Sequence, residues 1–309
     1  MNSAPVKAAR KRRGPLRHGS ADKLFLAVNT LLLTFFLVLL IYPLLFVITA
    51  SFSGGATVMS LSLWPKNITA IGYKAVFEYY FIWIGYRNSA IYMVAGTLIS
   101  LAVTICCAYP LSRPTFRGGK YVMALCVVTM YFNGGLIPTY LLVRDLGLLD
   151  SFWALALPGS LSIYNMIVMR TYFQRQIPDE LLEASQLDGC GDLRYLLQIV
   201  LPLSGPILAV ISLYVAVWLW NSYFDALIYM TTRAKMPLPI FLREILVLNS
   251  MDNSSQTMIG NADSMMAIEK RREIMKYALI VVASAPVMAI YPFVQKYFVK
   301  GVMIGAIKG

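Results

Sequence analysis

The sequence predicts an all-α integral membrane protein that crosses the bilayer six times. Of its 309 residues, 58% are hydrophobic and only 14% are charged, whereas soluble domains carry about 25% charged residues. Six hydrophobic windows each approach the roughly 20 residues that a bilayer-spanning helix requires. The expected spans are 24–50, 88–111, 121–142, 152–173, 206–229 and 275–295.

Residues 1–23 form a basic tail that precedes the first span. Its cationic residues are Lys7, Arg10, Lys11, Arg12, Arg13, Arg17 and Lys23. A basic segment beside a span is retained in the cytoplasm, and 24–50 is longer than the core of a signal peptide, about 7–15 residues. The net charge of +12 would suggest nucleic acid in a soluble chain. In a membrane protein it indicates contact with anionic lipid, so no nucleic-acid partner is expected.

An even number of spans places both termini in the cytoplasm. The transmembrane domain then covers 24–298, and 299–309 form a second cytoplasmic tail. Lys and Arg are concentrated in the segments expected inside, as the positive-inside rule requires. Lys270, Arg271 and Arg272 oppose this rule, because they adjoin the last span on its expected outer side. Their role is unexplained.

Two external segments differ in character. In the first, 51–87, the residues Tyr73, Val76, Phe77 and Tyr80 have helical spacing, which predicts a helix at the outer interface. In the second, 230–274, the polar run 249–263 is compatible with a disordered connector.

The longest polar-patterned stretch is 177–206. Pro178 suits a first helical position, and Asp179 and Glu180 place negative charge on the positive end of the helix dipole. Gly189 predicts the end of that helix. A second helix is expected from 192 to 200, ended by Pro202. The stretch is therefore an elbow of two helices between the fourth and fifth spans.

This elbow resembles the EAA loop of permease subunits of bacterial ABC importers. The likeness rests on Glu183-Ala184-Ser185, on the following glycine, and on Ile199-x-Leu201-Pro202, with Ser185 where the family usually has Ala. It implies a cytoplasmic coupling helix that docks on an ATPase. The residues expected to couple are Glu183, Ala184, Ser185, Asp188, Gly189, Ile199 and Pro202. The alternative is an ordinary amphipathic helix at the membrane surface.

A second stretch, 131–140 (YFNGGLIPTY), is similar to the carbohydrate permeases that serve polysaccharide fragments and complex oligosaccharides. Gly134, Gly135 and Pro138 would loosen the helix and expose backbone polar groups. Irregular backbone at membrane depth is tolerated where it is buried in protein or lines a water-filled cavity. Tight helix packing through small residues is the alternative.

The fifth span carries an ionisable group near its outer end. Intramembrane carboxylates usually serve a function, although Asp225 is close enough to the boundary to be simply hydrated. Asn221 and Asp225 are four residues apart in this predicted span, so we expect them to share a helix face. Together with the third span, they give a candidate substrate path: Asn133, Gly134, Gly135, Trp220, Asn221 and Asp225.

The resemblance implies a permease subunit of an ATP-driven carbohydrate importer in the bacterial cytoplasmic membrane, the inner or plasma membrane. Its expected partners are a second homologous permease subunit, two ATPase subunits and an external sugar-binding protein, into which 230–274 would reach. The tail 299–309 would approach the ATPases. ATP and Mg²⁺ would bind those partners, because Gly118-Gly119-Lys120 lacks the spacing of a P-loop. No catalytic, cofactor or metal site is expected in the chain.

Other functions fit the sequence less well. A secondary, ion-coupled sugar transporter normally contains two internal halves, and no repeat is visible. An ABC permease for a solute other than a sugar stays open as an alternative. A membrane enzyme would need a catalytic constellation, yet His18 is the one histidine and lies in the basic tail.

Overall fold

The computed structural model describes residues 19–53, 68–255, 274–292 and 295. Within them the chain is helical, apart from an isolated β-bridge between Ser53 and Ile68. The basic tail up to residue 18, the Lys270–Arg272 cluster and the tail 299–309 lie outside the described residues.

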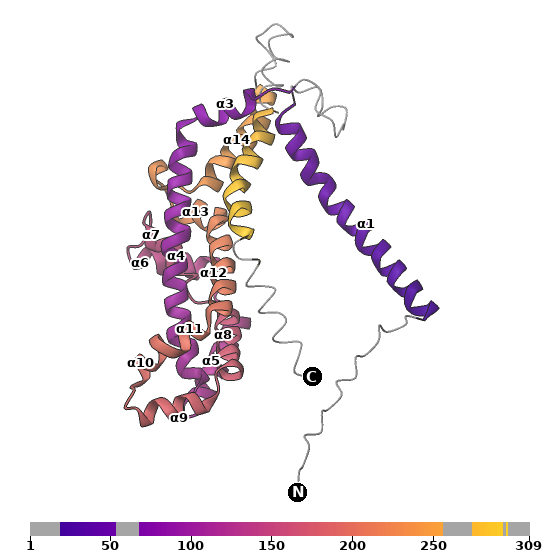
Figure 1. The fold of residues 1–309 in the computed structure, drawn as a ribbon. Helices are drawn as coiled ribbons and strands as arrows, with labels where there is room; N and C mark the ends of the chain where they lie inside the picture. Colours follow the sequence, from indigo (N-terminus) through magenta and orange to yellow (C-terminus); the bar gives the residue numbers. More distant parts are fainter. Residues whose placement is uncertain (1–18, 54–67, 256–273, 293–294, 296–309) are drawn as a thin grey trace.

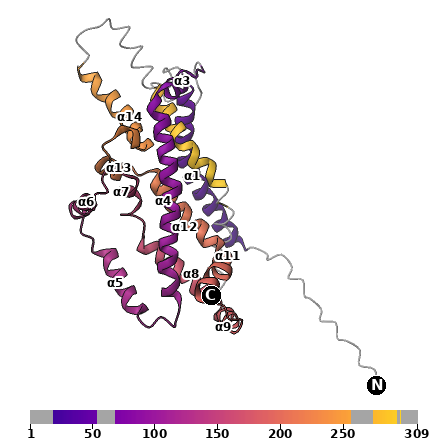
Figure 2. The ribbon, with the colours of Figure 1, turned by 90° about the vertical axis from the view of Figure 1, so that its left-hand side faces the viewer.

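A long helix, α4 (Tyr80–Ser112), forms the axis of the molecule. Figures 1 and 2 show it running from α3 (Ile71–Glu78) at one end toward the elbow helix α9 (Asp179–Leu187) at the other. α1 (Ser20–Ser51) diverges from this bundle, and only Ala50 and Ser51 in its last turn are buried. The helix expected in the first external segment is therefore present as α3, with Val76 buried.

The remaining elements follow α4 in the chain. They are α5 (Gly119–Tyr131), α6 (Leu136–Asp145), α7 (Phe152–Ala156), α8 (Ile163–Gln176), α9 (Asp179–Leu187), α10 (Asp192–Tyr195), the π turn η1 (Leu196–Val200), α11 (Leu201–Leu203), α12 (Gly205–Trp220), α13 (Tyr223–Tyr229), the 3-10 turn η2 (Arg233–Lys235), α14 (Leu238–Ser255) and a last helix, Ile274–Pro292.

Small residues along α4 let its neighbours approach closely. Buried small side chains recur about every four residues: Gly85, Ser89, Gly96, Ser100, Thr104 and Ala108. A Cβ added at Gly96 would lie 2.7 Å from Leu219 Cδ1 of α12, and one at Gly85 would lie 2.9 Å from the Leu238 Cα of α14. Helices in lipid associate through such close packing, because apolar burial gives no advantage over the lipid chains.

Among the residues that the structure describes, three helices are long and apolar enough to cross a membrane: Ser20–Ser51, Tyr80–Ser112 and Ile274–Pro292. They match the predicted spans 24–50, 88–111 and most of 275–295. Two bent pairs pass the same test together: α5 with α6, at 112°, and Asp192–Leu203 with α12, at 82°. The predicted span 121–142 is therefore a broken helix.

The prediction of one helix over 152–173 is wrong. The chain leaves the helix between α7 and α8, where Pro158 removes a backbone donor and cannot continue a helix. The adjacent Gly159 is covered by the Trp218 ring, which would lie 2.2 Å from an added Cβ. α8 has 14 residues, about 21 Å, against roughly 30 Å of hydrocarbon. A sixth crossing therefore requires a broken helix here.

The polar run 249–263 is not a disordered connector over its first part, because α14 continues to Ser255. The N-terminal end of α14 is fixed to α4, where the Leu238 N–H donates to Ser89 Oγ at 2.9 Å. Residues 256–263 lie outside the described residues.

Replacing Gly85 by Ala is expected to destabilise the protein by about 1–3 kcal/mol, because the new methyl group meets backbone of α14 that cannot rotate away. Gly205→Ala is the matched control, since no atom lies within 4 Å of its added Cβ. Thermal unfolding of the detergent-purified chain measures both. Equal midpoints for the two variants would contradict the close packing of α4 on α14.

Candidate functional site

The elbow contains a complete Schellman turn at the end of α9. Gly189 has a positive φ of 73°. The Cys190 N–H donates to the Ser185 carbonyl at 2.9 Å, and the Gly189 N–H donates to the Gln186 carbonyl at 3.0 Å. These bonds satisfy carbonyl groups that a helix end leaves free. The predicted helix stop at Gly189 is confirmed.

One face of α9 is held by the protein and the other is open. Ser185 is buried, and its hydroxyl donates to the Leu182 carbonyl at 2.7 Å. Glu183, Ala184 and Asp188 are exposed, and Leu187 is 90% exposed. An acidic and apolar surface therefore remains open at the end of the molecule opposite α3 (Figure 1).

The second helix of the elbow is longer than predicted. It continues through η1 to Leu203, so Pro202 lies inside it, not at its end. The π turn precedes Pro202, and its wider spacing relieves the clash between a proline ring and the carbonyl four residues earlier. Ile199 packs against the main core cluster, whereas Pro202 is exposed.

Arg113 connects the elbow to α4. Its side chain is 9% exposed, with the guanidinium carbon 4.8 Å from the Tyr109 ring centre and 5.0 Å from that of Tyr195 in α10. Asp179, in the first turn of α9, lies 4.0 Å away. Desolvated cation–π contacts contribute about 2 kcal/mol. From the sequence alone, Arg113 is recognisable only as a basic residue in a short loop.

α8 supports the same end of α4. Arg170 Nε donates to the Leu111 carbonyl at 2.7 Å, and Gln174 Nε2 donates to the Ser112 carbonyl at 3.3 Å. These side chains satisfy carbonyl groups in the last turn of α4. The elbow, α4 and α8 are thus joined at one end of the bundle.

The candidate path residues of the third span lie in the break between α5 and α6. Asn133 Oδ1 accepts the Gly135 N–H at 2.5 Å, and Gly135 has a positive φ of 85°. Asn133, Gly134 and Gly135 are all exposed. The predicted loosening of the helix at the two glycines is confirmed.

The prediction that Asn221 and Asp225 share a helix face is wrong. α12 ends at Trp220, and α13 starts at Tyr223. Asn221 Nδ2 donates to the Val217 carbonyl at 2.8 Å, and Ser222 Oγ donates to the Leu219 carbonyl at 2.7 Å. Such side-chain bonds compete with the helical pattern and favour its termination.

The three candidates at this break lie in different surroundings. Trp220 is 5% exposed, and its Nε1 donates to the Ala283 carbonyl of the last helix at 3.3 Å, so its ring belongs to the core. Asn221 is exposed and Asp225 is half-buried. α13 lies beside α6, since the Tyr140 and Tyr229 rings stack with centres 6.3 Å apart. The two breaks therefore occur on neighbouring elements.

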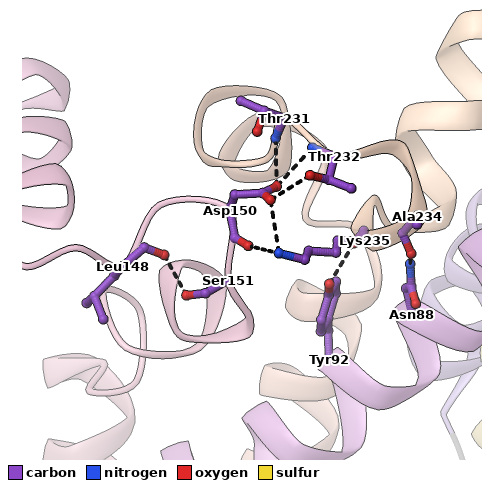
Figure 3. A network of polar contacts seen from close by, with 9 residues as sticks. All are labelled: Asn88, Tyr92, Leu148, Asp150, Ser151, Thr231, Thr232, Ala234 and Lys235. Carbon is purple, nitrogen blue, oxygen red and sulfur yellow. Dashed lines mark hydrogen bonds and ion pairs between the residues drawn. The ribbon is translucent and has the colours of Figure 1, made fainter.

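A polar network that sequence reasoning missed joins the loop before α7 to the turn after α13 (Figure 3). Asp150 Oδ1 accepts the N–H groups of Thr231 and Thr232 at 3.0 and 2.9 Å. Asp150 Oδ2 accepts the Thr232 hydroxyl at 2.7 Å and pairs with Lys235 Nζ at 3.0 Å. Asp150 itself has a positive φ of 54°. The partners lie some 80 residues apart, so no local pattern predicts them.

α4 holds the other side of this turn. Tyr92 Oη donates to the Lys235 carbonyl at 2.6 Å, and Asn88 Nδ2 donates to the Ala234 carbonyl at 2.8 Å (Figure 3). Asn88 Nδ2 also donates to the Met236 carbonyl at 3.0 Å. The bonds from Thr232, first its backbone N–H and then its hydroxyl, hold the pKa of the Asp150 carboxyl well below its usual range.

Comparisons with known proteins agree with this architecture. No protein-family model matches the chain. The polygalacturonan/rhamnogalacturonan transport system permease protein YtcP of Bacillus subtilis (strain 168) is 39% identical over 279 residues, 90% of this chain and 96% of YtcP. Protein LplC of the same organism is 37% identical, over 95% of this chain and 98% of its own length.

A solved structure is also similar. It is the crystal structure of a bacterial ABC transporter involved in the import of the acidic polysaccharide alginate, with a TM-score of 0.80, 33% identity, and coverage of 92% of this chain and all of that one. The fold and these likenesses define a transport permease, the membrane subunit of an ABC transporter. Within that class the chain belongs to the permease subunits of carbohydrate ABC transporters.

Gly189→Ala is expected to destabilise the elbow by about 1–2 kcal/mol, since a residue with a Cβ is strained at positive φ. Gly191→Ala is the matched control, because Gly191 has a φ of −75° and open space around it. Hydrogen exchange of the elbow amides measures the effect. Equal exchange in the two variants would contradict the Schellman turn.

The Asp150 network is expected to weaken in acid. Since the pKa of Asp150 is depressed on folding, its contribution is complete well above the ordinary value of 3.8 and is lost as pH falls from there toward the folded value. The intrinsic exchange of amides itself slows in acid, so the quantity to compare is the protection factor, the intrinsic rate divided by the observed rate at the same pH. At Thr231 and Thr232 the protection factor should therefore fall between about pH 6 and about pH 3. Asp150→Asn should reduce this pH dependence, whereas Asp145→Asn, whose carboxylate bonds to its neighbour Arg144, should leave it intact.

Proposed function

We propose that the chain crosses the membrane six times, with both termini in the cytoplasm, and that the elbow 177–206 lies in the cytoplasm between the fourth and fifth crossings. The broken segments α5–α6 and α7–α8 would serve as the third and fourth crossings. The observation that carries the proposal is the elbow itself. It presents exposed Glu183 and Leu187, while Leu182 packs against the main core cluster and Arg113 contacts Asp179 and Tyr195.

The elbow docks on an ATPase subunit. Its open surface combines exposed leucine with carboxylates, which suits a groove with an apolar floor and basic walls. The full importer comprises a second homologous permease subunit, two ATPase subunits that bind ATP and Mg²⁺, and an external sugar-binding protein. Segment 230–274 reaches toward that protein, and 299–309 toward the ATPases.

Transport follows from movement of the elbow. ATP binding closes the ATPase dimer and brings the elbows of the two permease subunits together. Arg113 passes this movement to α4, on which α8, α12 and α14 pack. The cavity between the permease subunits then opens outward, and hydrolysis returns it to the inward state. The free energy comes from outside this chain.

The cargo is a carbohydrate, either an oligosaccharide or a fragment of a polysaccharide. The substrates in the names of YtcP and of the galactooligosaccharides transport system permease protein GanQ of Bacillus subtilis (strain 168), which is 30% identical, support this class. The path runs past the two helix breaks, where Asn133, Asn221 and Asp225 supply polar groups beside the exposed backbone of Gly134 and Gly135. Trp220 supports this region from the core.

One observation favours a second candidate, a secondary transporter. Asp225 is half-buried in a predicted span, and no described hydrogen bond or ion pair joins it to another side chain, as in a proton-binding site. Uptake by vesicles whose proton gradient is dissipated separates the two. An ATP-driven importer keeps its uptake, whereas a proton-coupled transporter loses it.

Glu183→Lys is expected to weaken association with the ATPase subunits at least about ten-fold, because it reverses the charge on the open face of α9. Glu78→Lys, on the exposed surface of α3 at the opposite end, is the control. Copurification of the ATPases with membrane-inserted permease measures both. Normal recovery of the ATPases with Glu183→Lys would refute the docking role of the elbow.

A further inference from the structure

A pocket of about 330 Å³ lies between α13 and α14, on the face of α13 that carries Tyr223 and Leu227. This volume is at the lower end of the range for small-molecule sites, about 300–1,000 Å³. Its apolar lining includes Leu227 and Ile240, and its charged lining consists of Arg233, Arg243 and Glu244. Asp225 is two residues from Tyr223 and so projects from a different side of α13. The pocket is therefore distinct from the candidate path residues.

One of the two arginines is already paired. Arg233 Nη2 lies 2.9 Å from both carboxylate oxygens of Glu244, and its guanidinium carbon lies 4.5 Å from the Phe81 ring centre. The turn that carries Arg233 is the one fixed by Asp150, Asn88 and Tyr92 (Figure 3). Arg233 is thus a rigid wall of the pocket whose charge Glu244 balances.

Arg243 has no such carboxylate. Its guanidinium carbon lies 4.9 Å from the Tyr223 ring centre, and within the described residues no acidic group forms an ion pair with it. The Tyr223 hydroxyl is also buried, and it has no hydrogen-bond partner among the described residues. The lining therefore holds one positive charge in excess, on a planar group that recognises carboxylates through two parallel hydrogen bonds.

We propose that this pocket binds a carboxylate group of the transported carbohydrate, so that the importer takes a sugar acid, such as a uronate-containing oligosaccharide. Arg243 receives the carboxylate, and the Tyr223 ring and the apolar wall contact the sugar. The inference rests on the proposed carbohydrate cargo. An acidic side chain of a partner protein is the competing occupant, but the volume exceeds what one carboxylate requires.

Uptake of trigalacturonate and of its trimethyl ester by proteoliposomes containing the complete importer tests the inference. Arg243→Gln is expected to raise the KM for trigalacturonate by about ten-fold or more, since it removes hydrogen bonds to a charged group. The KM for the ester should change much less, because the ester has no carboxylate. Arg243→Lys should recover part of the loss. Arg144→Gln, at an exposed arginine beside Asp145, is the control.

The outcomes separate this inference from the proposed function. If the importer takes up neutral galactotriose but does not take up trigalacturonate, the inference is overturned, whereas the proposed import of carbohydrate still holds. Equal effects of Arg243→Gln on the acid and the ester would also overturn it. Loss of the second permease or the binding protein from the Arg243→Gln complex would assign the guanidinium to a protein contact instead. ATP-dependent uptake of no carbohydrate at all would refute the proposed function itself.

Discussion

The fold depends on how closely helices can approach α4. Its neighbours α8, α12 and α14 come from distant parts of the chain. In lipid, no hydrophobic driving force brings these helices together, because the lipid chains are as apolar as the side chains. What remains is dispersion between well-matched surfaces, which falls steeply with distance. The small residues of α4 supply that match, and the Ser89 hydroxyl adds a hydrogen bond to the start of α14.

The second constraint is that backbone N–H and C=O groups lose their helical hydrogen-bond partners where a helix breaks, and must find others. At the breaks after α5 and after α12, Asn133 accepts the Gly135 N–H and Asn221 donates to the Val217 carbonyl. Each break can therefore exist at a depth where water is scarce. The same bonds fix local geometry, so the breaks are built features of the fold, and the polar side chains beside them are held in defined positions.

The sequence predicted those features that depend on local patterns. Hydrophobic runs gave the continuous helices α1, α4 and 274–292, and the glycine after α9 gave the end of that helix. The break at Pro158 was missed because the window average stayed apolar across it. The break after Trp220 was missed because Asn221 is compatible with a helix until its side chain bonds to the backbone. Arg113, Asp150 and Arg243 were missed because the contacts that define their roles, with Tyr195, with Thr231 and Thr232, and with Tyr223, are remote in sequence.

The length of α4 has a mechanical consequence. Its 33 residues span about 50 Å, well beyond the roughly 30 Å of the hydrocarbon layer. A rod of that length that pivots near the middle of the bilayer moves its two ends in opposite directions, by about 4 Å for a tilt of about 10°. The Arg113 end is attached to the elbow and the Gly85 end to α14. A small displacement of α4 on one side of the membrane therefore produces a displacement of equal size and opposite direction on the other side.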